Sequence, residues 1–220
     1  MAVMDREKSN AQTKSLKLPI AREAVKFFGL FVFIYILLMA SWPLTGAVYL
    51  NFYQTAGRLL FGSLGCGDVV RFSQPDDNGD VINIIALNRH RLDENGQMTG
   101  AQLSHNIRYR EYIYAVFLTA LIAATPLPLK RRGGAIVWGL ILIHIFIIFR
   151  LAIIIIGLFS SDMVSVLILK PFWDNVLIIA EYIVVSNWFT GFIISFFIWV
   201  LVSFNHQDWL KIVIQKQEEK

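Results

Sequence analysis

Residues 130–159 read KRRGGAIVWGLILIHIFIIFRLAIIIIGLF, a short basic cluster followed by a long apolar run. A run of about 18 or more nearly uncharged residues is long enough to cross a hydrocarbon layer of about 30 Å. Lys and Arg residues beside such a run mark its cytoplasmic end. Residues 135–159 are therefore predicted to form a transmembrane helix, and Lys130, Arg131 and Arg132 place the start of that helix in the cytoplasm.

The composition of the whole chain agrees with this interpretation. Of its 220 residues 56% are hydrophobic and only 16% are charged, whereas a soluble domain usually carries about 25% charged residues. The formal charge of +4 comes from basic residues beside the apolar runs, so it indicates membrane orientation rather than nucleic-acid binding. The single cysteine, Cys66, excludes an intrachain disulfide and a cysteine-rich metal site.

Three more apolar runs complete the pattern, which predicts a mainly α-helical integral membrane protein with about four transmembrane helices. Its membrane is expected to be the cytoplasmic (inner) membrane, and an even number of crossings places both termini in the cytoplasm. The expected segments are a basic cytoplasmic tail (1–26), a first span (27–50), an extracytoplasmic segment (51–111), a second span (112–129), a cytoplasmic basic loop (130–134), a third span (135–159), an outer connection (160–174), a fourth span (175–204) and a cytoplasmic tail (205–220).

The extracytoplasmic segment is predicted to contain a short helix and a small sheet. Pro43 should kink or end the regular part of the first span, and the apolar spacing over Tyr53–Leu64 predicts a short amphipathic helix. The runs Val69–Ser73, Val81–Arg91 and Gln102–Tyr109 are separated by turn-forming clusters. They predict about three antiparallel strands, one face of which needs cover from the helix or the membrane surface.

Four side chains inside the predicted spans are candidates for pairing or function: Arg150, Glu181, His144 and Asn187. An ionisable residue there is costly unless it is paired, so it is a functional candidate by default. Arg150 and Glu181 stand at similar depths, and a buried ion pair between them would satisfy both charges; a ligand-binding or catalytic role for Arg150 stays open. His144 and Asn187 are expected to hydrogen-bond between helices.

Catalytic signals are weak. Cys66 lies between two glycines and is the only thiol nucleophile available, with His90 and His105 as the bases within its segment. No second His, Cys or carboxylate stands at ligand spacing from His144, so neither a metal nor another cofactor is predicted.

The order of these parts resembles a known family. A basic tail and one helix lead to the β segment, then to Asn106–Tyr109, Ala120–Pro126, the basic loop and a long helix containing Arg150. This arrangement, best matched over residues 80–160, resembles the small membrane proteins associated with exosortases and, more distantly, the exosortase/archaeosortase family.

That resemblance implies a cysteine and an arginine near the outer membrane face, together with a further basic residue, that process protein C-terminal anchors. Arg150 matches the arginine. Cys66 departs from the pattern because it precedes the β segment, and His206 falls on the cytoplasmic side. These departures favour a non-catalytic associate.

Two hypotheses follow. In the first, the chain is a non-enzymatic subunit or accessory protein of a cell-envelope complex that anchors an extracytoplasmic module; its partners would be lipids and other membrane or envelope proteins, in a homo- or hetero-oligomer. In the alternative, it is an exosortase-like membrane cysteine transpeptidase or protease that uses Cys66 and Arg150.

Overall fold

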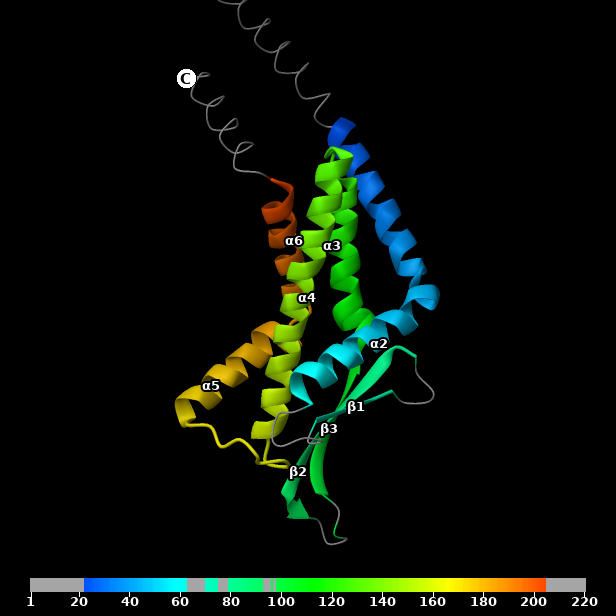
Figure 1. The fold of residues 1–220 in the computed structure, drawn as a ribbon. Coiled ribbons are helices and arrows are strands. Elements are labelled where there is room, and N and C mark those ends of the chain that lie inside the picture. The colour runs from blue at the N-terminus through cyan, green and yellow to red at the C-terminus, as the bar shows by residue number, and fades with distance from the viewer. Residues whose placement is uncertain (1–21, 63–69, 75–78, 93–95, 97, 205–220) are drawn as a thin grey trace, which may run out of the picture.

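The computed structural model describes residues 22–62, 70–74, 79–92, 96 and 98–204, which form a mostly helical molecule with one small antiparallel sheet (Figure 1). The helix Arg22–Ala40 and helices α3 (Ile113–Ala124), α4 (Leu129–Ser160) and α6 (Phe189–Ser203) form an elongated bundle. Helices α2 (Trp42–Phe61) and α5 (Pro171–Ala180) leave the bundle at an angle, and the sheet lies beyond its lower end in Figure 1.

Two helices are long and apolar enough to cross a membrane, Arg22–Ala40 and α4. Two further helical parts, Pro171–Ser186 and Phe189–Ser203, meet at a bend of 76°. Counted together as one span, they make a third candidate. Helix α3, with 12 residues, is too short on its own, at about 18 Å for about 1.5 Å per residue. Membrane insertion is therefore compatible with the fold, with two or three candidate spans where the sequence predicted about four.

The first helix stops at Ser41, and α2 starts again at Trp42 with Pro43 in its first turn. Proline is well tolerated there because its missing N–H would have no intrahelical partner. Helix α2 continues without interruption to Phe61, so the predicted boundary between residues 50 and 51 falls inside a helix and the short amphipathic helix forms its second half.

The sheet is the predicted meander, with strand order β1–β2–β3. Its strands are β1 (Val70–Ser73), β2 (Val81–Leu92) and β3 (Met98–Asn106). The third strand begins earlier than predicted, at Met98. It also ends earlier, because Arg108–Tyr112 form a π-helical segment, η1, that leads directly into α3.

Helix α2 covers one face of the sheet. The ring of Phe72 lies so close to Gly57 that a Cβ there would stand 2.6 Å from it, and Arg58 donates to the Phe72 carbonyl at 2.9 Å. The sheet also contacts the chain after α4, since buried Asn88 donates to the Val164 carbonyl at 2.6 Å. The sheet is thus held both by α2 and by the turn that follows α4.

The predicted loop over 130–134 is helical, because Pro128 directs the chain into α4 and the basic residues form its first turn. Arg132 donates to the Thr125 and Leu127 carbonyls at 3.2 and 3.1 Å, and Arg131 donates to the Ser203 carbonyl at 3.0 Å. These cations therefore satisfy carbonyls at the C-terminal ends of α3 and α6, where positive charge is favourable.

The predicted fourth span over 175–204 is broken. Helix α5 passes into a second π-helical segment, η2 (Glu181–Ser186), and Asn187 is extended with φ −80° and ψ 105°. Helix α6 then starts in a new direction.

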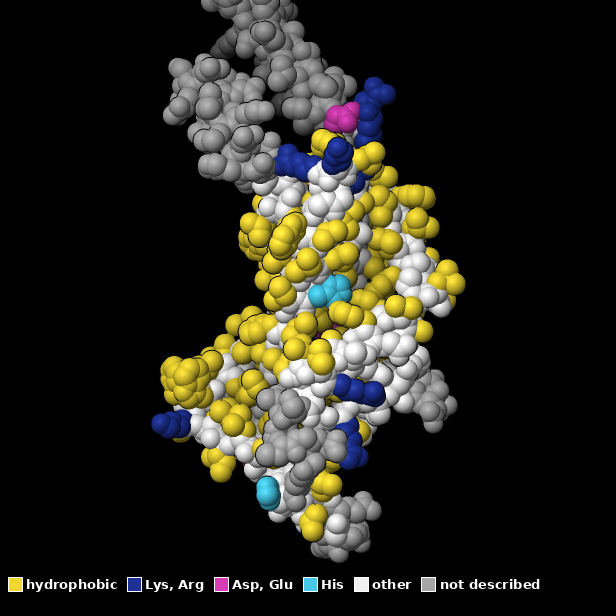
Figure 2. All heavy atoms as spheres, viewed as in Figure 1, with side chains coloured by type: hydrophobic (Ala, Val, Ile, Leu, Met, Phe, Trp, Pro, Cys, Tyr) yellow, Lys and Arg dark blue, Asp and Glu magenta, His cyan; other side chains and the backbone are white. Residues whose placement is uncertain are grey.

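Charged and apolar side chains gather on different parts of the face shown in Figure 2. Lys and Arg gather at the end where α4 begins and again around the sheet and the tip of α5, while the bundle between them is covered by apolar side chains.

Candidate functional site

Arg150 of α4 is completely buried at the lower end of the bundle. Its Nε donates to the Val184 carbonyl at 3.0 Å, and its Nη2 donates to the Val185 carbonyl at 3.2 Å. Its Nη1 donates to the Arg110 carbonyl at 2.6 Å and to the Glu111 carboxylate at 3.1 and 3.2 Å. All three guanidinium nitrogens therefore have acceptors within this chain.

The Glu111 carboxylate joins Arg150 to the sheet. Glu111 is also completely buried, and its Oε1 lies 2.8 Å from Nε2 of His105 in β3. An ionised carboxylate can only accept hydrogen bonds, so His105 carries its proton on Nε2 and donates it. We call His105, Glu111 and Arg150 the buried triad.

The two π-helical segments explain why an arginine occupies this place. A π-turn interrupts the regular i to i−4 hydrogen bonding of a helix. Here η1 turns the Arg110 carbonyl toward α4, and η2 does the same with Val184 and Val185. An arginine offers five N–H donors in a planar fork, which serve these separate acceptors and a carboxylate together.

Two tyrosines of α2, one helical turn apart, lie beside the buried triad. The ring of Tyr53 stacks on that of His105 with centroids 6.3 Å apart. The hydroxyls of Tyr49 and Tyr53 are buried without a hydrogen-bond partner among the described residues. Burial raises the pKa of the Tyr53 phenol well above its usual range, and the nearby Glu111 carboxylate raises it further. The phenol is therefore held neutral.

The prediction that Glu181 pairs with Arg150 is wrong. Glu181 lies at the start of η2 with its carboxylate against Gly157 of α4, and the carboxylate that binds Arg150 belongs to Glu111. The helical turns after Glu181 carry the chain past Arg150, so η2 presents carbonyls to the guanidinium instead of the Glu181 side chain.

The other predicted polar residues are not part of the buried triad. His144 hydrogen-bonds through Nδ1 to the Leu140 carbonyl of its own helix at 2.7 Å, and it lines an apolar groove of about 720 Å³ with Tyr49, Phe52 and Tyr112. Asn187 is exposed, and its Oδ1 accepts from the Phe189 backbone N–H at 3.1 Å, so its side chain bonds locally before α6 instead of joining two helices.

Cys66 and His206 lie outside the described residues. Within the described residues, no group of three or more His, Cys, Asp or Glu side chains could hold a metal ion.

The role of Glu111 was not predicted from the sequence, and His105 was predicted only as a base for Cys66. Glu111 directly precedes the apolar run of the second predicted span. A carboxylate at that position next to Tyr112 was a signal, since ionisable groups at the edge of a span need a partner. The position of His105 could not be found in this way, because it depends on the fold of β3 against α2.

The side chains of the buried triad bond to one another and to nearby backbone carbonyls. The buried triad places one carboxylate between a guanidinium and an imidazole, and the acceptors of Arg150 come from η1 and η2. Breaking such a pair leaves an uncompensated buried charge and is strongly destabilising. This geometry is therefore well suited to holding elements together.

Comparison of the chain with known protein families, with characterised proteins and with solved structures finds no match. The resemblance to exosortase-associated proteins stays a prediction.

Proposed function

We propose that this chain is a non-enzymatic integral membrane subunit or accessory protein of a larger cell-envelope complex. The helix Arg22–Ala40 and helices α3, α4 and α6 cross the cytoplasmic membrane, both termini are cytoplasmic, and the sheet is presented on the outer side. Helix α3 gains the length it lacks from η1 before it and from residues 125–128 after it.

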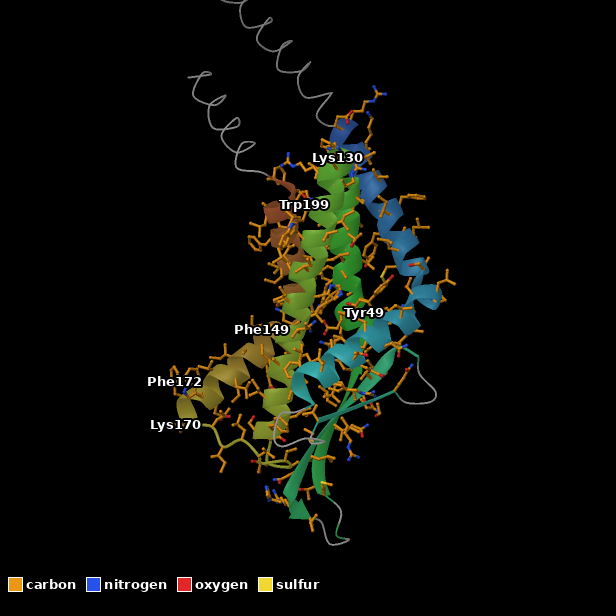
Figure 3. The ribbon with its side chains drawn as sticks, viewed as in Figure 1. Tyr49, Lys130, Phe149, Lys170, Phe172 and Trp199 are labelled. Atoms are coloured by element: carbon orange, nitrogen blue, oxygen red, sulfur yellow. The ribbon has the colours of Figure 1, made fainter. Side chains whose placement is uncertain are left out.

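The charge distribution along α4 supports this orientation. Lys130, Arg131 and Arg132 lie in its first turn, and Arg150 follows about 30 Å later at about 1.5 Å per residue. That separation equals the thickness of a typical hydrocarbon layer. Figure 3 shows the same order, with Lys130 at one end and Phe149, the neighbour of Arg150, at the level where α5 and α2 leave the bundle. The buried triad then lies at the outer boundary of the hydrocarbon.

The observation that carries the proposal is that all three guanidinium nitrogens of Arg150 donate to acceptors within the chain. An arginine that binds a substrate carboxylate needs at least one face of its guanidinium open to a cavity. Here its three nitrogens donate to η1 and η2, and it lies 5.4 Å from the ring of Tyr114. The buried triad thus joins the sheet to the bundle, as expected of a protein that holds a module in a fixed place for partners.

The experiment is site-specific photo-crosslinking in native membranes. A photoreactive amino acid replaces Gln102, which is exposed on edge strand β3, and in a matched control it replaces the exposed Glu23 at the cytoplasmic end. Mild extraction and mass spectrometry then identify the adducts. A stoichiometric envelope protein crosslinked from Gln102 but not from Glu23 is expected. Recovery of the bare chain from both variants would contradict the proposal.

A further inference from the structure

Helix α5 is mostly apolar, yet the described part of the chain covers little of it. None of its residues is buried. Phe172 is 67% exposed, Trp173 58% and Ile179 57%. Its polar residues, Asp174 and Asn175, lie in its first half, after Lys170, and the rest of the helix is apolar. An exposed helix of this amphipathic kind is suited to the plane of a membrane interface.

Helix α5 is not needed for a membrane crossing. At one end of α6, the Trp188 carbonyl accepts from the Tyr114 hydroxyl at 2.9 Å, beside Arg150. At the other end, the Ser203 carbonyl accepts from Arg131. Helix α6 therefore runs by itself between the level of Arg150 and that of the basic turn. Its 15 residues span about 22 Å at about 1.5 Å per residue, and the contacts of Trp188 and Ser203 lie at its two ends.

The bend places α5 beside the bundle at the outer end of this crossing. The two helical parts meet at 76°, and the η2 carbonyls that hold the bend are fixed by Arg150. In Figure 3, Phe172 and Lys170 mark the outer end of α5, farther from Lys130 than Phe149 is. The helix thus slopes away from the hydrocarbon boundary toward Lys170.

The side chains around α5 are those of a membrane–water interface. Trp173 near its start and Tyr182 and Trp188 beyond its end are exposed, and Lys170 precedes it. Trp and Tyr concentrate at the level of lipid headgroups, and a lysine beside them reaches toward water.

We propose that α5 is an interfacial anchor that inserts into the outer headgroup layer, with the lipid surface as its partner. The apolar side chains of α5 contact lipid, and Lys170 stays at the aqueous side. The anchor leaves the bundle at the level of the buried triad, so it would hold the sheet close to the membrane surface. This inference rests on the proposed four crossings.

The test measures the depth of spin labels in vesicles of phosphatidylcholine and phosphatidylglycerol. The full chain carries Cys66→Ser, and single cysteines replace Phe172, Val176 or Ile179 on α5. Three exposed α4 positions, Val137, Ile141 and Phe149, calibrate the depth. Accessibility to oxygen, which enters lipid, is compared with accessibility to a water-soluble nickel complex.

We expect the labels at Val137 and Ile141 to report the hydrocarbon interior and the label at Phe149 to report its boundary. All three α5 labels should lie no deeper than the label at Phe149. They should still be more accessible to oxygen than to the nickel complex. An α5 label as deep as that at Ile141 would overturn the anchor in favour of a straight span. Free access of nickel to α5, or exclusion of both colliders as by a protein partner, would overturn it as well.

The calibration separates the two proposals. If the α4 labels themselves show no lipid contact, the membrane crossings fail and the anchor fails with them. If the α4 labels behave as expected and only the α5 labels do not, the anchor alone is wrong.

Discussion

At the scale of single residues, the Arg150–Glu111 pair is the contact on which the proposed structure depends most, because both side chains are fully buried. We predict that Arg150→Met lowers the free energy of unfolding by about 3–5 kcal/mol, since it removes the guanidinium from a buried carboxylate and leaves only the His105 contact. Glu111→Met should also destabilise the protein. The double variant should lose less stability than the sum of the losses in the two single variants, because neither charge of the pair remains. Denaturant unfolding in detergent micelles measures all three.

The control for this cycle is the exposed ion pair Lys26–Glu23. Lys26→Met should change stability little, because exposed pairs contribute at most about 1 kcal/mol. Strict additivity of the Arg150 and Glu111 variants would contradict the pairing.

Tyr53 offers a second test at this scale. Its hydroxyl is buried without a partner among the described residues, and an unsatisfied buried hydroxyl costs about 1–3 kcal/mol. Tyr53→Phe keeps the ring on His105 and removes the hydroxyl, so we predict unchanged or higher thermal stability. Tyr53→Leu, which loses the stacking, should destabilise. A clear loss in Tyr53→Phe would show that the hydroxyl has a partner, such as an internal water.

The sequence identified Arg150 as a candidate from its charge within an apolar run, but it could not identify its partner. Glu181 and Glu111 both stand at the edge of a predicted span. The choice between them depends on the π-turns of η1 and η2, and no residue pattern in either segment predicts such a turn.

At the scale of elements, close helix packing depends on a few glycines. A Cβ at Gly191 of α6 would collide with the ring of Tyr114 in α3. We predict that Gly191→Ala lowers the unfolding free energy by about 1–3 kcal/mol, the usual cost of overpacking. Gly29→Ala is the matched control, since nothing lies within 4 Å of its added Cβ and alanine favours helix. Thermal unfolding in detergent compares them; equal melting temperatures would contradict close packing of α3 on α6.

Most elements were predictable because their patterns are local. Apolar runs indicated the helices, turn clusters separated the strands, and Pro43 marked the break before α2. The bend between η2 and α6 was not, because residues 175–204 read as one apolar run. Its cause is a long-range contact, the donation of Arg150 to the Val184 and Val185 carbonyls.

At the scale of the whole molecule, the buried triad joins two parts of different character, an apolar bundle and a sheet with charged surroundings (Figure 2). The proposed position puts the apolar bundle in the membrane and the sheet in water. In this proposed arrangement the basic turn of α4 is placed at one boundary, Arg150 at the other, and the sheet beyond it in water.

The most direct measurement of this arrangement is the sidedness of two cysteines in intact cells, in a chain that carries Cys66→Ser. Thr99→Cys lies in β3, and Gly133→Cys lies in α4 directly after its three basic residues. We predict that a membrane-impermeant maleimide labels Thr99→Cys from outside and reaches Gly133→Cys only after lysis. Labelling of both without lysis, or the reverse order, would contradict the proposed placement of the sheet and the basic turn on opposite sides of a membrane.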